Sequence, residues 1–252
     1  MTVSNEHIAA VAREMSLKSI YVVISSFKRG ISTSVLDDLT EIPSTTVIPY
    51  PNGIQLRAVS SSANDSSSGT GVRTLMLEYL DSNYLYVEEI IVLNGVTPVN
   101  SVATNIQRIT CLHSHTVGSA GTAVGNISLT NIAGSVTYDY ITAGGNQSLT
   151  GHFTVPDDRI GFITGWQGTS TKQAVSLRLR ATRDRCTGER LPGVFIFQDI
   201  VNLKDAASGQ LCFASYLKCA PRTDIKLSAI STDASSADAS ASFSIILVPK
   251  YE

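Results

Sequence analysis

Apolar and polar residues alternate with a period of two over much of the chain, which is the pattern of half-buried β-strands. The clearest case is a hairpin in which Leu75, Leu77 and Tyr79 alternate with more polar neighbours before the chain reverses at 81–83. The returning strand, 84–93, ends at the turn-forming pair Asn94-Gly95. Further strand candidates, most of them separated by Gly, Asn, Asp or Pro, lie at 106–112, 126–130, 135–140, 149–155, 159–166, 174–182, 194–201, 225–231 and 242–248. This spacing predicts an all-β chain with a β-sandwich or jelly-roll-like architecture.

The start of the chain has a different period. Ile8, Val11 and Met15 share one face of a short helix that Ser4 can cap and in which Glu6 suits the first turn. The apolar face of this helix suggests that it docks against something larger, so these three residues are predicted to bind a partner.

After this helix, residues 17–26 are rich in β-branched and aromatic residues and are expected to form a strand. Prolines at 43, 49 and 51 then interrupt a polar stretch over 27–53. Because proline cannot donate a hydrogen bond to a sheet, this stretch is expected to be a linker or an arm.

The pattern divides the chain into three regions. Residues 1–53 hold the helix, the strand and the Pro-rich arm, residues 54–145 form a first β lobe, and residues 146–252 form a second. Gly144-Gly145-Asn146 is the expected seam between the lobes, although a plain loop fits equally well. The low-complexity stretch 231–242 is expected to be a solvated loop or a polar strand edge.

Composition narrows the class of protein. Lys and Arg number 19 against 21 Asp and Glu, for a net charge of −2, and charged residues make up only 16% of the 252 residues. An ordinary domain has ~25% charged residues, and here 32 Ser and 24 Thr take their place. This balance excludes a charge-rich disordered chain and a wholly basic nucleic-acid binder.

No stretch predicts a membrane partner or a disulfide scaffold. No apolar run approaches the ~20 residues that a membrane helix needs, and the N-terminus has no basic-then-apolar signal pattern. Four cysteines in 252 residues are expected to stay as thiols in a reducing cytosol.

The search for chemistry begins at Cys111, His113 and His115, which would point to one face of a strand. Three such ligands could hold zinc if a fourth came from elsewhere, but the same spacing arises on any polar strand face. His152 has no signature partner, and the chain contains no G-x-S-x-G elbow. We therefore predict no catalytic site, no cofactor and no metal.

One basic concentration stands out. Arg178 and Arg180 alternate with leucines and are followed by Arg183 and Arg185. A nucleic-acid groove would add exposed aromatic residues and a wider basic surface, so we favour a stripe of arginines at an interface between subunits and predict no nucleic-acid partner.

The surface composition carries the positive signal. A sheet face that bears Ser, Thr and Asn can be covered by another protein without removing water from many charges. Short hydroxyl side chains also lose little rotamer entropy on docking. Such a face suits repeated packing in an assembly, although a monomer with a hydroxyl-rich surface has the same composition.

Two stretches resemble a family of virion structural proteins of tailed bacteriophages. The first, 58–95, matches that family's "SSxAND…GTGxR" loop and the hairpin that turns at "LDxNY" and ends in "LNG". The second begins at Thr154-Val155-Pro156 and continues through GFITGW, SLRLRATRD, RTDIKLSAIST and ASFSIILV. Cys219-Ala220-Pro221-Arg222 departs from the pattern, which has a Glu-Lys pair there. The helix and the arm are unmatched.

The resemblance implies a phage virion protein, most simply a capsid cement or decoration protein that binds the major capsid protein on the capsid surface. A homotrimer or another cyclic oligomer is the expected self-association, and residues 1–53 are expected to reach onto a neighbour. The alternative is a component of the tail, neck or fibre that binds host-surface glycans. In that case Trp166, the tyrosines of the 79–86 hairpin and the loop 144–148 would line a shallow sugar site. A buried core anchor is the competing interpretation of Trp166.

Overall fold

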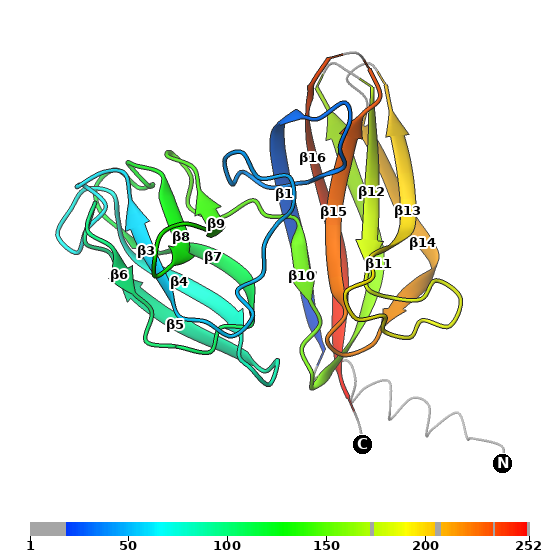
Figure 1. The fold of residues 1–252 in the computed structure, drawn as a ribbon, viewed down its shortest axis with the longest axis horizontal. Coiled ribbons are helices and arrows are strands. Elements are labelled where there is room, and N and C mark those ends of the chain that lie inside the picture. Colours follow the sequence, from blue (N-terminus) through cyan, green and yellow to red (C-terminus); the bar gives the residue numbers. More distant parts are fainter. Residues whose placement is uncertain (1–18, 172–173, 205–207, 234, 251–252) are drawn as a thin grey trace.

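A computed structural model describes residues 19–171, 174–204, 208–233 and 235–250. The described chain is all β, with no helix, and its strands form four antiparallel sheets in two lobes (Figure 1). The all-β prediction is therefore confirmed. The helix predicted around Ile8, Val11 and Met15 lies outside the described residues. No described segment is a helix long and apolar enough to cross a membrane.

The large lobe, residues 19–53 and 148–250, contains two sheets. Sheet A has the order β1-β16-β11-β14, with bounds Ile20–Ile31, Ala237–Pro249, Arg159–Ser170 and Ser208–Cys219. Sheet B has the order β10-β15-β12-β13, with bounds His152–Thr154, Asp224–Ser231, Val175–Ala181 and Ile196–Leu203. The short strand β2, Asp37–Asp38, also pairs with β15.

The strand order of the large lobe is that of a jelly roll. Counted along this lobe alone, its eight long strands run 1-8-3-6 in sheet A and 2-7-4-5 in sheet B. The space between the sheets is filled by apolar side chains from both, among them Phe153, Trp166, Leu177 and Phe243. The interior of this lobe is therefore a packed core.

The small lobe, residues 54–147, is inserted between the first and second strands of the jelly roll. One of its sheets has the order β6-β3-β8-β9, with bounds Val99–Asn100, Leu56–Ser60, Ile127–Asn131 and Thr137–Ile141. The other has the order β5-β4-β7, with bounds Tyr86–Val92, Val72–Leu80 and Arg108–Val117. A second apolar core lies between them. Strands β4 and β5 are the predicted hairpin, and Leu75, Leu77 and Tyr79 are buried as the alternation required.

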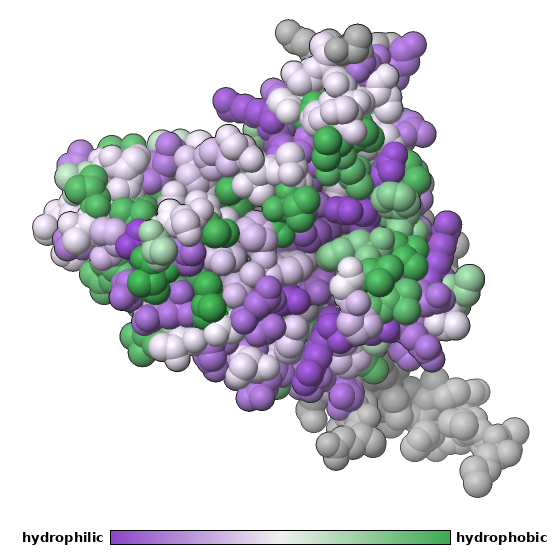
Figure 2. Space-filling model, in the orientation of Figure 1, coloured by the Kyte–Doolittle hydropathy of each residue, from purple (hydrophilic) through white to green (hydrophobic). Residues whose placement is uncertain are grey.

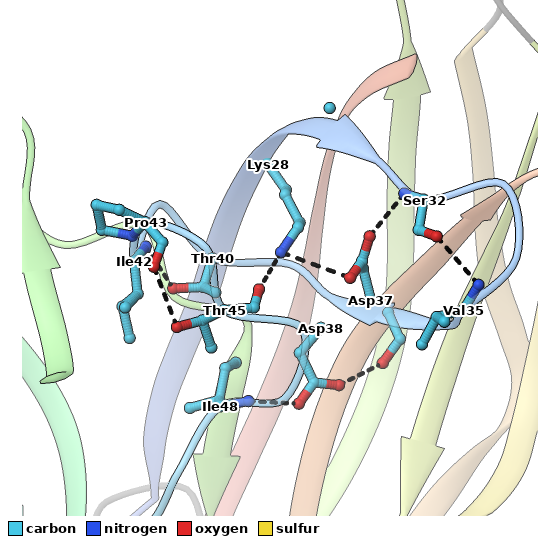
Figure 3. A network of polar contacts seen from close by, with 12 residues as sticks. Lys28, Ser32, Val35, Asp37, Asp38, Thr40, Ile42, Pro43, Thr45 and Ile48 are labelled. Atoms are coloured by element: carbon cyan, nitrogen blue, oxygen red, sulfur yellow. Dashed lines mark hydrogen bonds and ion pairs between the residues drawn. The ribbon is translucent and has the colours of Figure 1, made fainter. Parts of the chain in front are cut away.

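The Pro-rich stretch 27–53, which the sequence predicts to be an arm, instead packs against the sheets of the large lobe. β1 pairs with β16 from Ile20 to Ile31, and Leu39 and Ile48 are fully buried. Polar contacts hold the loop between them (Figure 3): Asp37 accepts a hydrogen bond from the Ser32 amide at 2.7 Å and lies 3.7 Å from the Lys28 ammonium. The prolines fit because they lie in this loop, outside the ladders.

The low-complexity stretch 231–242 is not only a loop, because its second half belongs to β16. From Ala237 to Ser242, alanines face the core and Asp238, Ser240 and Ser242 face outward. Small residues alternate here with the period of a strand, and alanine is small enough for the close approach of the two sheets.

The "SSxAND…GTGxR" stretch forms a loop around one buried carboxylate. Asp65 accepts hydrogen bonds from the Ser60 hydroxyl at 2.6 Å and from the amides of Val72 and Gly125, both at 2.8 Å. A Cβ on Gly71 would lie 2.0 Å from an Asp65 oxygen, so only glycine fits there. These residues of the motif therefore hold the fold of the small lobe.

Candidate protein-binding surface

The four arginines of the predicted stripe do not share one surface. The predicted alternation is confirmed, since Leu177 and Leu179 are buried in the core while Arg178 and Arg180 lie on the outer face of sheet B. Arg180 forms an ion pair with Asp38. Arg183 is buried, and it donates to the Lys218 carbonyl at 2.5 Å and to the Gln198 side chain at 2.8 Å.

Arg180 is the one arginine of the set that pairs with a described carboxylate, and Arg178 and Arg185 make no described side-chain hydrogen bond either. Arg178 lies over the Phe197 ring at 4.8 Å from its centroid, next to the exposed Ile200. Arg185 is exposed in the loop after β12. Of the predicted set, Arg178 therefore combines a cation with an apolar surface, the composition that interfaces favour.

A buried ionic network lies under the loop 39–48 and between the two lobes. Asp38 is bonded to the Lys226 ammonium at 2.7 Å, to the Ser228 hydroxyl at 2.9 Å and to the Ile48 amide at 2.9 Å. Burial alone would raise the pKa of Asp38, but Lys226 and Arg180 hold it below the usual value. The carboxylate is therefore a fixed negative charge that organises the cations around it.

The same network joins the lobes. Arg108, on β7 of the small lobe, donates to Asp224 on β15 at 2.9 Å, and its guanidinium stacks over Tyr50 at 4.1 Å. Thr150 donates to the buried Asp139 of β9 at 2.7 Å. Both pairs are buried, so they fix how one lobe is oriented on the other.

His152 belongs to this junction and is out of reach of solvent. Its Nε2 lies 2.7 Å from the Ile109 carbonyl oxygen, and the ring packs edge-on against Tyr50. Burial, together with the positive charge of Lys226, lowers the pKa of His152 to about 4 and outweighs the Ile109 carbonyl and the nearby carboxylates, which act in the opposite direction. The neutral ring therefore donates from Nε2 and holds β10 against β7.

The strand with Cys111, His113 and His115 contains an irregularity. Cys111 and His113 face outward opposite Glu78 and Met76, but the pairing shifts between Thr74 and Leu75, so His115 does not follow in register. Burial raises the pKa of the Cys111 thiol to about 12. Among the described residues, no three His, Cys, Asp or Glu side chains converge as a metal site would require.

Trp166 is a core residue. Its indole Nε1 donates to Asp199 at 2.9 Å across the two sheets, and the ring is buried among the apolar side chains. The competing interpretation as a core anchor is the right one, and Trp166 cannot stack on a sugar. Its hydrogen bond satisfies the one polar atom of the ring inside the core.

The outer face of sheet A is the charge-free surface that the composition indicated. We call it the hydroxyl face, and it consists of Tyr21, Val23, Ser25, Thr164, Gln167, Thr169, Ser208, Gln210, Ser240, Ser242 and Ser244. Four strands contribute to it, and two recesses of about 300 and 380 Å³ lie along it.

Among the described residues of sheet A, the charged side chains on the outer side lie toward its ends, outside the hydroxyl face. Arg29 and Asp238 lie at one end, and Lys218 lies at the other. Within the face, the Thr169 and Ser240 hydroxyls bond to each other at 2.7 Å. A second protein could cover the middle of sheet A without removing water from a charge, which is the costly step in forming an interface.

Comparisons with known proteins leave the chain without a named family. No family model and no curated protein matches it. Among solved structures, that of infectious bursal disease virus Gt strain is 10% identical with a TM-score of 0.26, covering 91% of this chain and 72% of that one. The structure of the Gx strain is 11% identical with a TM-score of 0.26, covering 92% of this chain and 71% of that one. The structure of a VP2 subviral particle of the same virus is 10% identical with a TM-score of 0.23, covering 93% of this chain and 77% of that one.

These neighbours come from virus particles, but TM-scores of 0.23 to 0.26 indicate little common structure.

Proposed function

We propose that the chain is a structural protein of a bacteriophage particle, a cement or decoration protein that binds the shell of major capsid protein through the hydroxyl face. It has no catalytic role in this proposal, and it acts on the capsid surface as a homotrimer or another cyclic oligomer. The observation that carries the proposal is the charge-free outer face of sheet A, which spans four strands.

The jelly-roll fold supports this proposal only in combination with the packed apolar core between its two sheets. Jelly rolls occur in viral capsid proteins, in lectins and in cupins, so the fold alone names no function. Here apolar side chains from both sheets pack the space between them. The proposal therefore rests on the surface of the large lobe, where the hydroxyl face extends over four strands without a charged side chain.

The experiment introduces a charge in the middle of the face. Ser242→Glu and Gln167→Glu each place a carboxylate where a partner would exclude water, and we expect the affinity for purified, undecorated phage shells to fall by at least about 100-fold. Ser119→Glu is the matched control, because Ser119 is exposed on the small lobe and far along the chain from sheet A. Shell binding by both face variants at wild-type affinity would refute the proposal.

Copy number in the virion separates this proposal from a tail, neck or fibre component. A shell protein is present in proportion to the major capsid protein, whereas a tail or fibre protein is present in few copies. The glycan alternative has lost Trp166 to the core, and a glycan array tests the exposed remainder around Tyr86.

A further inference from the structure

Two patches of opposite charge lie on different lobes, and each combines charge with exposed apolar side chains. The acidic patch, on β5 and β4, consists of Glu78, Tyr86, Glu88, Ile90 and Val92, which share the outer face of their sheet. The basic patch, on β12 and β13, consists of Arg178, Phe197 and Ile200.

Large apolar side chains are exposed in both patches. Ile90 and Val92 are 49% and 50% exposed on β5, and Phe197 and Ile200 are 39% and 45% exposed on β13. Figure 2 shows green side chains gathered on the large lobe near the start of β13. Both strands are at the edge of their sheets, so no further strand shields these side chains.

The acidic patch carries more carboxylates than cations, because Arg159, which lines the same recess, lies 3.4 Å from the carboxylate of Asp158. Glu78 and Glu88 are directly opposite each other in the β4–β5 ladder, a pairing of like charges that destabilises a sheet unless a positive group lies nearby. His113 lies 3.3 Å from Glu78, and the Tyr86 hydroxyl donates to Glu88 at 2.9 Å. Neither partner is a permanent positive charge.

The two carboxylates also lie in a recess. A groove of about 360 Å³ between the lobes is lined by Glu78, Tyr86 and Glu88 on one side and by Ile20 and Leu247 on the other. Apolar walls lower the local dielectric, so an ion pair formed there gains more than one on a flat surface.

The basic patch carries a cation that pairs with no described carboxylate. Arg178 makes no ion pair with a described residue, and its Nε is buried without a hydrogen-bond partner. Stacking on Phe197 holds the guanidinium among apolar side chains. Its charge is therefore uncompensated, whereas that of the neighbouring Arg180 is neutralised by Asp38.

We propose that the basic patch of one copy binds the acidic patch of a second copy, with Arg178 between Glu78 and Glu88. Figure 1 shows β5 and β13 on opposite sides of the molecule, so they cannot meet within one chain. Contact between two different patches is head-to-tail, and it generates a closed ring when the rotation between copies closes. This inference rests on the self-association in the proposed function and specifies the surfaces involved.

Charge reversal tests the pairing. Arg178→Glu and Glu88→Arg each place like charges across the contact, so each variant alone should lose self-association by at least about tenfold in analytical ultracentrifugation. A one-to-one mixture of the two should recover contacts between unlike variants, because each variant then meets opposite charge on the other, although only a ring with an even number of copies can close in this way. The double variant in one chain should recover self-association for the same reason.

Arg29→Glu is the matched control, since it changes the net charge equally at an exposed site on β1. Circular dichroism of each variant establishes that it is folded. If Arg29→Glu weakens association as much as Arg178→Glu, or the folded double variant fails to associate, the assigned contact is wrong.

Shell binding distinguishes this inference from the function that it rests on. Folded Arg178→Glu that no longer self-associates but still binds shells supports separate surfaces for the two contacts. A wild-type protein that stays monomeric at every concentration, and yet binds shells, overturns the self-contact while the proposed function stands.

Discussion

Two buried groups at the lobe junction should give the protein opposing responses to acid. Burial lowers the pKa of His152 to about 4, and burial raises the pKa of Asp139 to about 6. The usual values are about 6.5 for histidine and about 3.9 for aspartate. Each group is fully buried, so each shift is a difference in proton binding between the folded and unfolded chain.

The signs of the two effects are opposite. The unfolded chain protonates His152 first, so the stability that the neutral ring contributes above pH ~6.5 is lost as the pH falls toward 4. The folded chain protonates Asp139 first, so stability is gained as the pH falls through about 6. At 1.36 kcal/mol for each pKa unit, each effect is worth about 2–3 kcal/mol between pH ~7.5 and ~4.5.

Two variants separate the effects. His152→Gln removes the acid-sensitive group and keeps an amide that can donate to the Ile109 carbonyl, so its stability relative to wild type should rise on acidification by about 2–3 kcal/mol. The stability of Asp139→Asn relative to wild type should fall on acidification by a similar amount, because the asparagine keeps an acceptor for Thr150 but takes up no proton. The free energy of unfolding is measured by urea denaturation at several pH values. Variant curves that run parallel to the wild-type curve would refute the assignment of both groups.

Three other changes test what holds the two lobes. Lys226→Met should lower the free energy of unfolding by ~3–5 kcal/mol in urea denaturation, because the buried Asp38 loses one of its two cations. The double variant Lys226→Met/Asp38→Asn should recover part of this loss, and an equal loss in the single and double variants would contradict the reasoning. Asp65→Ala should cost ~3 kcal/mol or more, because several buried donors lose their acceptor, and hydrogen exchange should rise first at the amides of Val72 and Gly125. Arg108→Gln should leave each lobe folded but loosen the junction, which small-angle scattering would record as a larger radius of gyration; an unchanged radius would show that Asp224 is not needed for the orientation.

Local patterns predicted the strands well where each strand carries its own alternation and its own turn. The hairpin of β4 and β5 is such a case, because Leu75, Leu77 and Tyr79 mark the buried face and Asn94-Gly95 marks the end. Strands β3 and β14 were missed. β14 begins at Ser208-Gly209 and ends shortly before Pro221, and its apolar residues follow no clear period of two in the sequence.

Pairings between distant residues could not be read from the sequence. β1 pairs with β16, more than 200 residues later, and the small lobe is inserted between neighbouring strands of the jelly roll. Alternation reports only that a strand has a buried face, and it does not identify the partner strand. The Pro-rich stretch suggested an arm for the same reason, because the buried side chains that anchor it, such as Leu39 and Ile48, contact residues far along the chain.

The arginines show how the same limit affects a functional prediction. All four lie within eight residues and form one basic concentration in the sequence, yet Arg180 pairs with Asp38 of β2, 142 residues away. Arg183 is used inside the lobe, and Arg178 is the cation of the set that lies among exposed apolar side chains. Local charge density therefore located the strand of interest, while the tertiary pairing decided which of its charges is available to a partner.

A rigid junction links the fold to assembly. A head-to-tail ring closes only if the two contact surfaces of each copy keep a fixed relation to each other. Those surfaces lie on different lobes, and the buried contacts of Arg108 with Asp224 and of Thr150 with Asp139 cross between the lobes. Buried polar pairs of this kind add little net stability over apolar packing, but they require one geometry to be satisfied. In the ring that we propose, the ionic network of the junction is therefore the element that fixes the angle between successive copies.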